Sequence, residues 1–175
     1  MYNVIVADDE KNIREGIVEL IEWEKLGCKV CASMQNGAQV LKYLEEEKIH
    51  VDIIITDIKM PIMDGMELIG MLNERFPDIK VIILTAYSDF TYAQQAIKFQ
   101  VSDFVVKNDF FLELPRAVKK IIEQCEVDAK KCVGREKEIP FFQGEACRVC
   151  ACVAYQHHLV LQHGDFWCLH NLRHS

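Results

Sequence analysis

The chain has 175 residues, which suffices for one domain of about 100–150 residues with its own core, plus an appendage. Half of the residues are hydrophobic and 27% are charged, as in soluble globular proteins, and the net charge of −7 argues against a nucleic-acid-binding surface. No apolar run reaches the roughly 18 residues of a membrane span, and Met1 leads directly into a predicted strand rather than a signal peptide. We therefore expect a cytoplasmic protein that does not contact the membrane.

Strand-like and helix-like segments alternate along the first two thirds of the chain. The predicted strands cover residues 2–7, 28–33, 53–56, 80–84 and 104–106. The predicted helices cover residues 11–22, about 40–48, 66–76, 92–99 and about 114–125. Five such repeats require parallel strands joined by right-handed crossovers. The prediction is an α/β fold with a doubly wound five-stranded parallel sheet, flavodoxin-like in its order 2-1-3-4-5, flanked by five helices.

Acidic side chains follow two of these strands. Asp8 and Asp9 come after the first strand, and Asp57 comes after the third, which is its neighbour in the predicted order. Alone, Asp57 would be an exposed carboxylate in a strand-to-helix turn. Three carboxylates at one sheet edge would raise one another's pKa unless a cation neutralises them. Oxygen ligands with room for water suit Mg²⁺ better than Ca²⁺.

The fourth and fifth strands end in Thr85 and Lys107. Taken singly, one is a strand-end hydroxyl and the other a solvated cation. Because all parallel strands end at the same edge, we expect both side chains to converge on the carboxylates.

Four stretches carry a family resemblance: VADDE, DIKMPIMDG, LTAYSD with Thr85, and Lys107 after FVV. With them the chain resembles the CheY-like receiver domains of two-component response regulators over about residues 1–124. Within that family it is similar to receivers that precede AraC-type helix-turn-helix domains. The resemblance implies a phosphorelay protein whose output in relatives is transcription, and no enzymatic activity beyond its own magnesium-dependent phosphorylation and dephosphorylation.

The resemblance also implies roles for single residues. Asp57 would be the nucleophile that accepts a phosphoryl group from a sensor histidine kinase. Asp9, Asp57 and the Lys59 carbonyl would ligate Mg²⁺, with Asp8 supporting it through water. Lys107 would pair with one phosphoryl oxygen.

The switch implied by the resemblance involves Thr85, which would hydrogen-bond the phosphoryl group, and Phe104, which would turn inward. The surface that changes, and through which a homodimer would form, is the fourth helix, fifth strand and fifth helix. Lys59 and Tyr87 occupy positions that tune phosphate lifetime in the family. Phe104 stands where Tyr is commoner, which removes a hydroxyl and keeps the ring.

One departure concerns the residue after Lys107. Family members usually have Pro there, often across a cis bond, whereas this chain has Asn108. A cis bond before a non-proline residue costs about 2.5–4 kcal/mol, so the predicted alternatives are a strained bond or a changed loop path.

The sequence divides into a receiver at 1–124, a charged helical extension at 125–138 and a Cys/His-rich tail at 139–175. The tail holds no lysine, four of the eight cysteines and five of the six histidines. It is either a disordered or mistranslated end, a small packed appendage, or a Zn²⁺ site that includes Cys147 and Cys150. We expect reduced thiols before it. The tail lacks the pattern of a helix-turn-helix domain, so we expect no direct DNA binding by this chain.

Two other functions are alternatives to a phosphoacceptor. A pseudo-receiver that acts only as a binding or dimerisation module is kept open by the changed loop at Lys107. A phosphohydrolase of the haloacid-dehalogenase type would need a second Asp two residues after Asp57, where Lys59 stands.

Overall fold

A computed structural model describes residues 1–47, 49–86 and 101–135, with side chains described as far as Asp128. The chain forms two compact units, Met1–Asp128 and Ala129–Ser175. The predicted fourth helix at 92–99, the tuning position Tyr87 and the tail at 139–175 lie outside the described residues. No described helix has the combination of length and apolarity needed to cross a membrane.

The described strands form one parallel sheet in the order β2-β1-β3-β4-β5, which confirms the predicted topology. Its strands are β1 (Tyr2–Ala7), β2 (Cys28–Met34), β3 (Ile53–Asp57), β4 (Lys80–Thr85) and β5 (Asp103–Val106). Because all pairs are parallel, Asp57 and Thr85 both close their strands at the same edge of the sheet. That edge is where doubly wound folds place their ligands.

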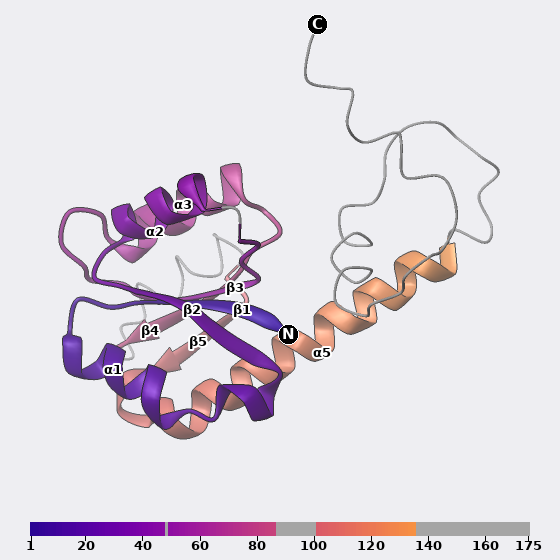
Figure 1. Ribbon diagram of the computed structural model, residues 1–175, viewed down its shortest axis with the longest axis horizontal. Coiled ribbons are helices and arrows are strands. Elements are labelled where there is room, and N and C mark those ends of the chain that lie inside the picture. Colours follow the sequence, from indigo (N-terminus) through magenta and orange to yellow (C-terminus); the bar gives the residue numbers. More distant parts are fainter. Residues whose placement is uncertain (48, 87–100, 136–175) are drawn as a thin grey trace, which may run out of the picture. The chain divides into compact units, whose positions relative to one another are not determined.

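Helices cover both faces of the sheet. The described α-helices are α1 (Lys11–Leu20), α2 (Gly37–Glu46), α3 (Gly65–Arg75) and α5 (Phe110–Arg135), with short 3₁₀ turns η1 (Trp23–Leu26) and η2 (Lys107–Asp109). Figure 1 shows α2 and α3 together on one face, and α1 and the first half of α5 on the other.

The fifth helix begins four residues earlier than predicted, at Phe110, and continues to Arg135. The early start was hidden because Phe111 and Leu112 are 54% and 61% exposed, so the first turn breaks the apolar periodicity that marks a buried helix face. The first helix also ends earlier than predicted, at Leu20, where Ile21 takes up an extended backbone.

The core consists of two apolar layers separated by the sheet. Ile53 and Ile55 pack in the layer under α1 and α5, whereas Ile54 packs in the layer under α2 and α3. Side chains alternate between the two faces of a strand, so an unbroken isoleucine run fits a strand that is buried on both sides. Burying each of these isoleucines contributes about 1.5–3 kcal/mol to the stability of the fold, which favours β3 as a central strand.

Candidate functional site

Four polar side chains are buried at the carboxyl edge of the sheet. Asp8 follows β1, Asp57 ends β3, Thr85 ends β4 and Lys107 follows β5, and none is more than 6% exposed. The structure therefore brings together the edge residues that the strand order predicted. Asp9 lies beside them in the same turn but is exposed.

Lys107 lies between three carboxylates. Its Nζ is 2.9 Å from Asp57 Oδ2, 2.9 Å from Glu10 Oε1 and 2.9 Å from Asp8 Oδ2. The first two contacts are hydrogen bonds that the ammonium donates. The contact with Asp8 is an ion pair without hydrogen-bond geometry, and this buried oxygen accepts no hydrogen bond in the described structure.

The pKa values show which charges the site disfavours. Burial raises the pKa of the Asp8 and Asp57 carboxyls, and the hydrogen bonds and charge of Lys107 offset this only in part. Burial lowers the pKa of Lys107, yet its pKa is raised, because hydrogen bonds with Glu10 and Asp57 and the close contact with the Asp8 carboxylate outweigh the burial. The ammonium therefore remains charged, while the surplus of carboxylates favours a further cation.

The corner between β3 and α3 fixes the position of Asp57. The Ile58 N–H donates to Asp57 Oδ1 at 2.7 Å, which leaves Oδ2 for Lys107. The Gly65 N–H donates to the Ile58 carbonyl at 2.9 Å, and a Cβ at position 65 would lie 2.0 Å from the Asp57 carbonyl oxygen. Only glycine permits this approach. Asp64 and Glu67 form a capping box that begins α3 directly after it.

The loop before Gly65 contains a strained residue. Ile62 has a φ angle of 71° and is 85% exposed. A β-branched side chain rarely adopts this left-handed backbone. The loop is held on either side of it, because the Met63 N–H donates to the Pro61 carbonyl at 2.8 Å and the Gly37 N–H donates to the Met63 carbonyl at 3.1 Å.

The turn between β1 and α1 is equally well held. The Glu10 N–H donates to Asp8 Oδ1 at 2.9 Å, and the buried Arg14 donates from Nη1 to the Asp8 carbonyl at 2.6 Å. Carboxylate oxygens of Asp8, Asp9 and Glu10 lie within 4.8 Å of one another. These hard oxygen donors, together with the buried Asp8 Oδ2 that accepts no hydrogen bond, fit a magnesium ion.

Thr85, Phe104 and Lys59 are the other residues with predicted roles at this site. Thr85 is buried and pairs in register with Val106, which precedes Lys107. Phe104 is half-buried and packs against the core layer under α2 and α3. The side chain of Lys59 is exposed, and its carbonyl as a metal ligand stays a prediction.

The loop at Lys107 follows a changed path. The described residues contain no cis peptide bond, so the Lys107–Asn108 bond is trans, and η2 leads from Lys107 straight into α5. Lys107 nevertheless reaches Asp57. Glu10, the third acid of the run that follows β1, was not among the predicted site residues, and the structure places it on Lys107.

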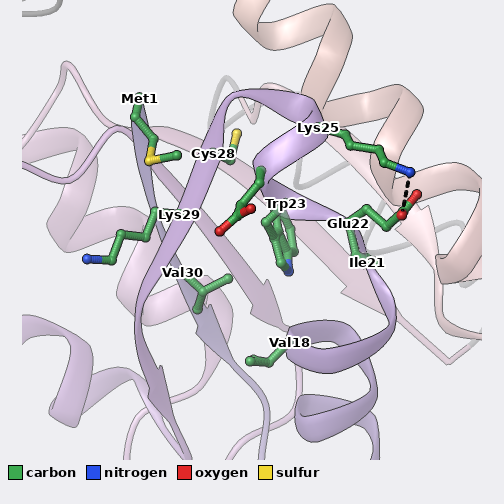
Figure 2. Close-up of a pocket in the computed structure, with 10 residues that line it drawn as sticks. Met1, Val18, Ile21, Glu22, Trp23, Lys25, Cys28, Lys29 and Val30 are labelled. Atoms are coloured by element: carbon green, nitrogen blue, oxygen red, sulfur yellow. Dashed lines mark ion pairs between the residues drawn. The ribbon is translucent and has the colours of Figure 1, made fainter.

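A cavity of about 690 Å³ lies elsewhere, among residues of α1, η1 and β2. Figure 2 shows Trp23, Cys28 and Val30 among its lining residues. Cys28 pairs with Tyr2 at the beginning of β1, so the cavity is at the opposite edge of the sheet from Asp57. Burial raises the pKa of Cys28 to about 11, so its thiol stays protonated at neutral pH and is a poor nucleophile.

Comparison with known proteins places these observations in a family. Residues 4–119 match the family described as "Response regulator receiver domain". The chain is 38% identical over 107 residues to the uncharacterized transcriptional regulatory protein YesN of Bacillus subtilis, an alignment that covers 61% of this chain and 28% of that protein. It is 30% identical over 128 residues to the transcriptional regulatory protein HptR of Staphylococcus aureus, covering 71% of this chain and 49% of that protein.

Solved structures agree. The REC domain of AraT, a response regulator from Geobacillus stearothermophilus, matches with a TM-score of 0.61 and 38% identity, covering 70% of this chain and 96% of that one. A response regulator receiver domain protein from Clostridium thermocellum matches with a TM-score of 0.64 and 28% identity, covering 73% of this chain and 98% of that one. The chain spans between about a quarter and a half of the length of the two regulators YesN and HptR. The fold, the buried polar edge and the family match together show that this chain belongs to the response regulator receiver domains of two-component systems.

Proposed function

We propose that Asp57 accepts a phosphoryl group from the phosphohistidine of a sensor histidine kinase, and that the receiver then changes conformation to control an output. One observation carries this proposal. Lys107 reaches across from the fifth strand to lie 2.9 Å from Asp57 Oδ2, within an edge that holds more carboxylates than cations.

The reaction is the displacement of an imidazole nitrogen by a carboxylate oxygen. The phosphorus–nitrogen bond of the kinase breaks, an oxygen–phosphorus bond to Asp57 forms, and the imidazole leaves with the electron pair. Asp57 Oδ1 is held by the Ile58 N–H, so the carboxylate cannot rotate freely. Lys107 would stabilise negative charge on a phosphoryl oxygen, and the Thr85 hydroxyl would hydrogen-bond another.

The residues present would hold Mg²⁺ through Asp9, Asp57 and the Lys59 carbonyl, with Asp8 supporting through water. When bound, the metal would neutralise charge on the transferring phosphoryl oxygens. The surplus of carboxylates, and the buried Asp8 Oδ2 that accepts no hydrogen bond, support this assignment.

The output and the partners follow from the relatives. Because YesN and HptR are named as transcriptional regulatory proteins, the proposed output is transcription. Thr85 and Phe104 would carry the switch, and a homodimer would form through the fourth helix, β5 and α5. Direct DNA contact is not expected from this chain, and its cytoplasmic location remains a prediction.

The pseudo-receiver alternative depended on the unusual residue after Lys107. That alternative is disfavoured because Lys107 is buried and contacts Asp57 despite the trans bond. The phosphohydrolase alternative still lacks the second Asp that it needs, since Lys59 stands in its place.

The test is incubation with a small-molecule phosphodonor and Mg²⁺, followed by intact-mass measurement. One phosphoryl group should be added to the wild-type protein and none to Asp57→Asn. Asp78→Asn, which removes an exposed carboxylate elsewhere, should be labelled like the wild type. Persistent labelling of Asp57→Asn would contradict the assignment.

A further inference from the structure

Glu10 is a charged residue at the site to which the proposed function gives no role. Its Oε1 accepts a hydrogen bond of 2.9 Å from Lys107 Nζ. The two residues are 97 positions apart in the sequence, so their pairing joins the turn after β1 to the loop after β5. We propose that Glu10 is a positioning residue that directs the Lys107 ammonium toward Asp57, an inference that rests on the proposed phosphoryl chemistry.

Three carboxylate oxygens surround the ammonium, two as hydrogen-bond acceptors and that of Asp8 as an ion-pair partner. A lysine ammonium has three N–H groups, and Lys107 Nζ has three carboxylate oxygens at 2.9 Å, one each from Asp8, Glu10 and Asp57. When Asp57 becomes phosphorylated, the contact with Asp57 is the one that a phosphoryl oxygen replaces. Asp8 and Glu10 then remain as the two oxygens that hold the nitrogen in place.

The main chain of Glu10 is fixed, which allows its side chain to act as a support. Its N–H donates to Asp8 Oδ1 at 2.9 Å, and its carbonyl accepts from the Arg14 N–H at 3.0 Å. Asp8, Glu10 and Lys107 thus form a closed ring of contacts.

The side chain of Glu10 is 59% exposed, whereas that of Asp8 is fully buried. Exposure weakens an ion pair, and pairs of this kind are worth about 0.2–1 kcal/mol. Glu10 should therefore affect the orientation of Lys107 and leave the fold intact. We expect Glu10→Gln to slow phosphorylation by about 1.4- to 5-fold, which is that energy expressed as a rate.

The experiment is a double-mutant cycle of Glu10→Gln and Lys107→Ala, measured as single-turnover phosphorylation by a small-molecule phosphodonor at Mg²⁺ concentrations that saturate each variant. Glu10→Gln should slow the reaction in the wild-type background and have no further effect when Lys107 is alanine. Glu19→Gln removes the same charge from the exposed end of α1 and should leave the rate unchanged. An undiminished effect in the Lys107→Ala background would overturn the proposal, because Glu10 would then act on the metal or the phosphodonor.

A second readout does not depend on phosphorylation. In metal-free, ¹⁵N-labelled protein, the hydrogen-bonded Lys107 ammonium should give a signal that Lys107→Ala removes. That signal should shift or broaden in Glu10→Gln and stay in place in Glu19→Gln. An unchanged signal in Glu10→Gln would overturn the proposal, whereas failure of the wild-type protein to accept any phosphoryl group would refute the proposed function and leave this contact testable.

Discussion

The Lys107 ammonium and the Asp57 carboxylate, 50 residues apart in the sequence, meet at 2.9 Å in the buried edge of the sheet. Their pairing brings β5 and β3 into one site although β4 lies between them. It also means that Lys107 and a metal ion would compete for the same carboxylates, which separates the expected effects of the two kinds of substitution.

Asp9→Ala should weaken Mg²⁺ binding about 10-fold or more and slow phosphorylation, because the metal loses a charged ligand. Lys107→Ala should slow phosphorylation while Mg²⁺ binds as tightly or more tightly, since a competing cation is removed. Isothermal titration calorimetry is the suitable measurement of metal binding. Tryptophan fluorescence is less suitable, because Trp23 lies at the opposite edge of the sheet. Equal losses of metal affinity in both variants would contradict the separate roles.

Gly65→Ala should impair both stability and phosphorylation. The added methyl group would meet the Asp57 carbonyl oxygen at 2.0 Å, so the corner between β3 and α3 must shift. We expect a loss of about 1–3 kcal/mol in the free energy of unfolding, measured by urea denaturation, and a slower mass shift with the phosphodonor. Gly70→Ala is the control, because the added methyl meets no atom within 4 Å beyond its chain neighbours and the backbone of its own helix. A Gly65→Ala protein that behaves like this control would show that the corner does not position Asp57.

The buried carboxyls predict a particular dependence of stability on pH. The folded-state pKa of Asp8 and Asp57 is raised, chiefly by burial, so their ionisation opposes folding once the pH exceeds their ordinary value of 3.8. At pH 7, Asp57→Asn and added Mg²⁺ should therefore each raise the melting temperature by a few degrees. Both increments should shrink as the pH falls through the raised folded-state pKa and vanish below 3.8, where the carboxyls are protonated in either state. Increments that do not depend on pH would exclude this origin.

The central strand should be sensitive to truncation on both of its faces. Ile54→Ala and Ile55→Ala remove fully buried side chains from different core layers and should each cost about 2–5 kcal/mol in chemical denaturation. Ile49→Ala is a suitable comparison, because that residue is 47% exposed and its truncation should cost much less. A small effect at Ile54 or Ile55 would mean that one layer can collapse around the missing atoms.

The tail at 139–175 should be dispensable for the chemistry at Asp57, because the lysines end before it and the five strands already share a core. Cutting after Glu138 should leave phosphorylation and the melting temperature nearly unchanged. A large drop in melting temperature would indicate that tail side chains pack on the receiver. Stoichiometric zinc that is lost on truncation would favour the metal site instead.

The strand order and the buried edge were predictable, because the isoleucine run and the polar residues at the strand ends are local patterns. The pairing of Glu10 with Lys107 was not, since it depends on the path of the loop after β5. The same is true of the start of α5, where exposed Phe111 and Leu112 hide the helix. The roles of Asp57, Thr85, Lys107 and the metal ligands stay predictions, as do the domain limits at 124 and 138.

Ile62 gives the loop beside Asp57 a strained backbone. A β-branched residue with a φ angle of 71° lies roughly 1–3 kcal/mol above its relaxed backbone, and its exposed side chain recovers almost none of that through packing. The main-chain hydrogen bonds of Met63 and Gly37 keep the loop in this arrangement. A rearrangement that let Ile62 adopt a negative φ angle would release this energy. The strained arrangement therefore persists only as long as the main-chain hydrogen bonds on either side of Ile62 remain intact.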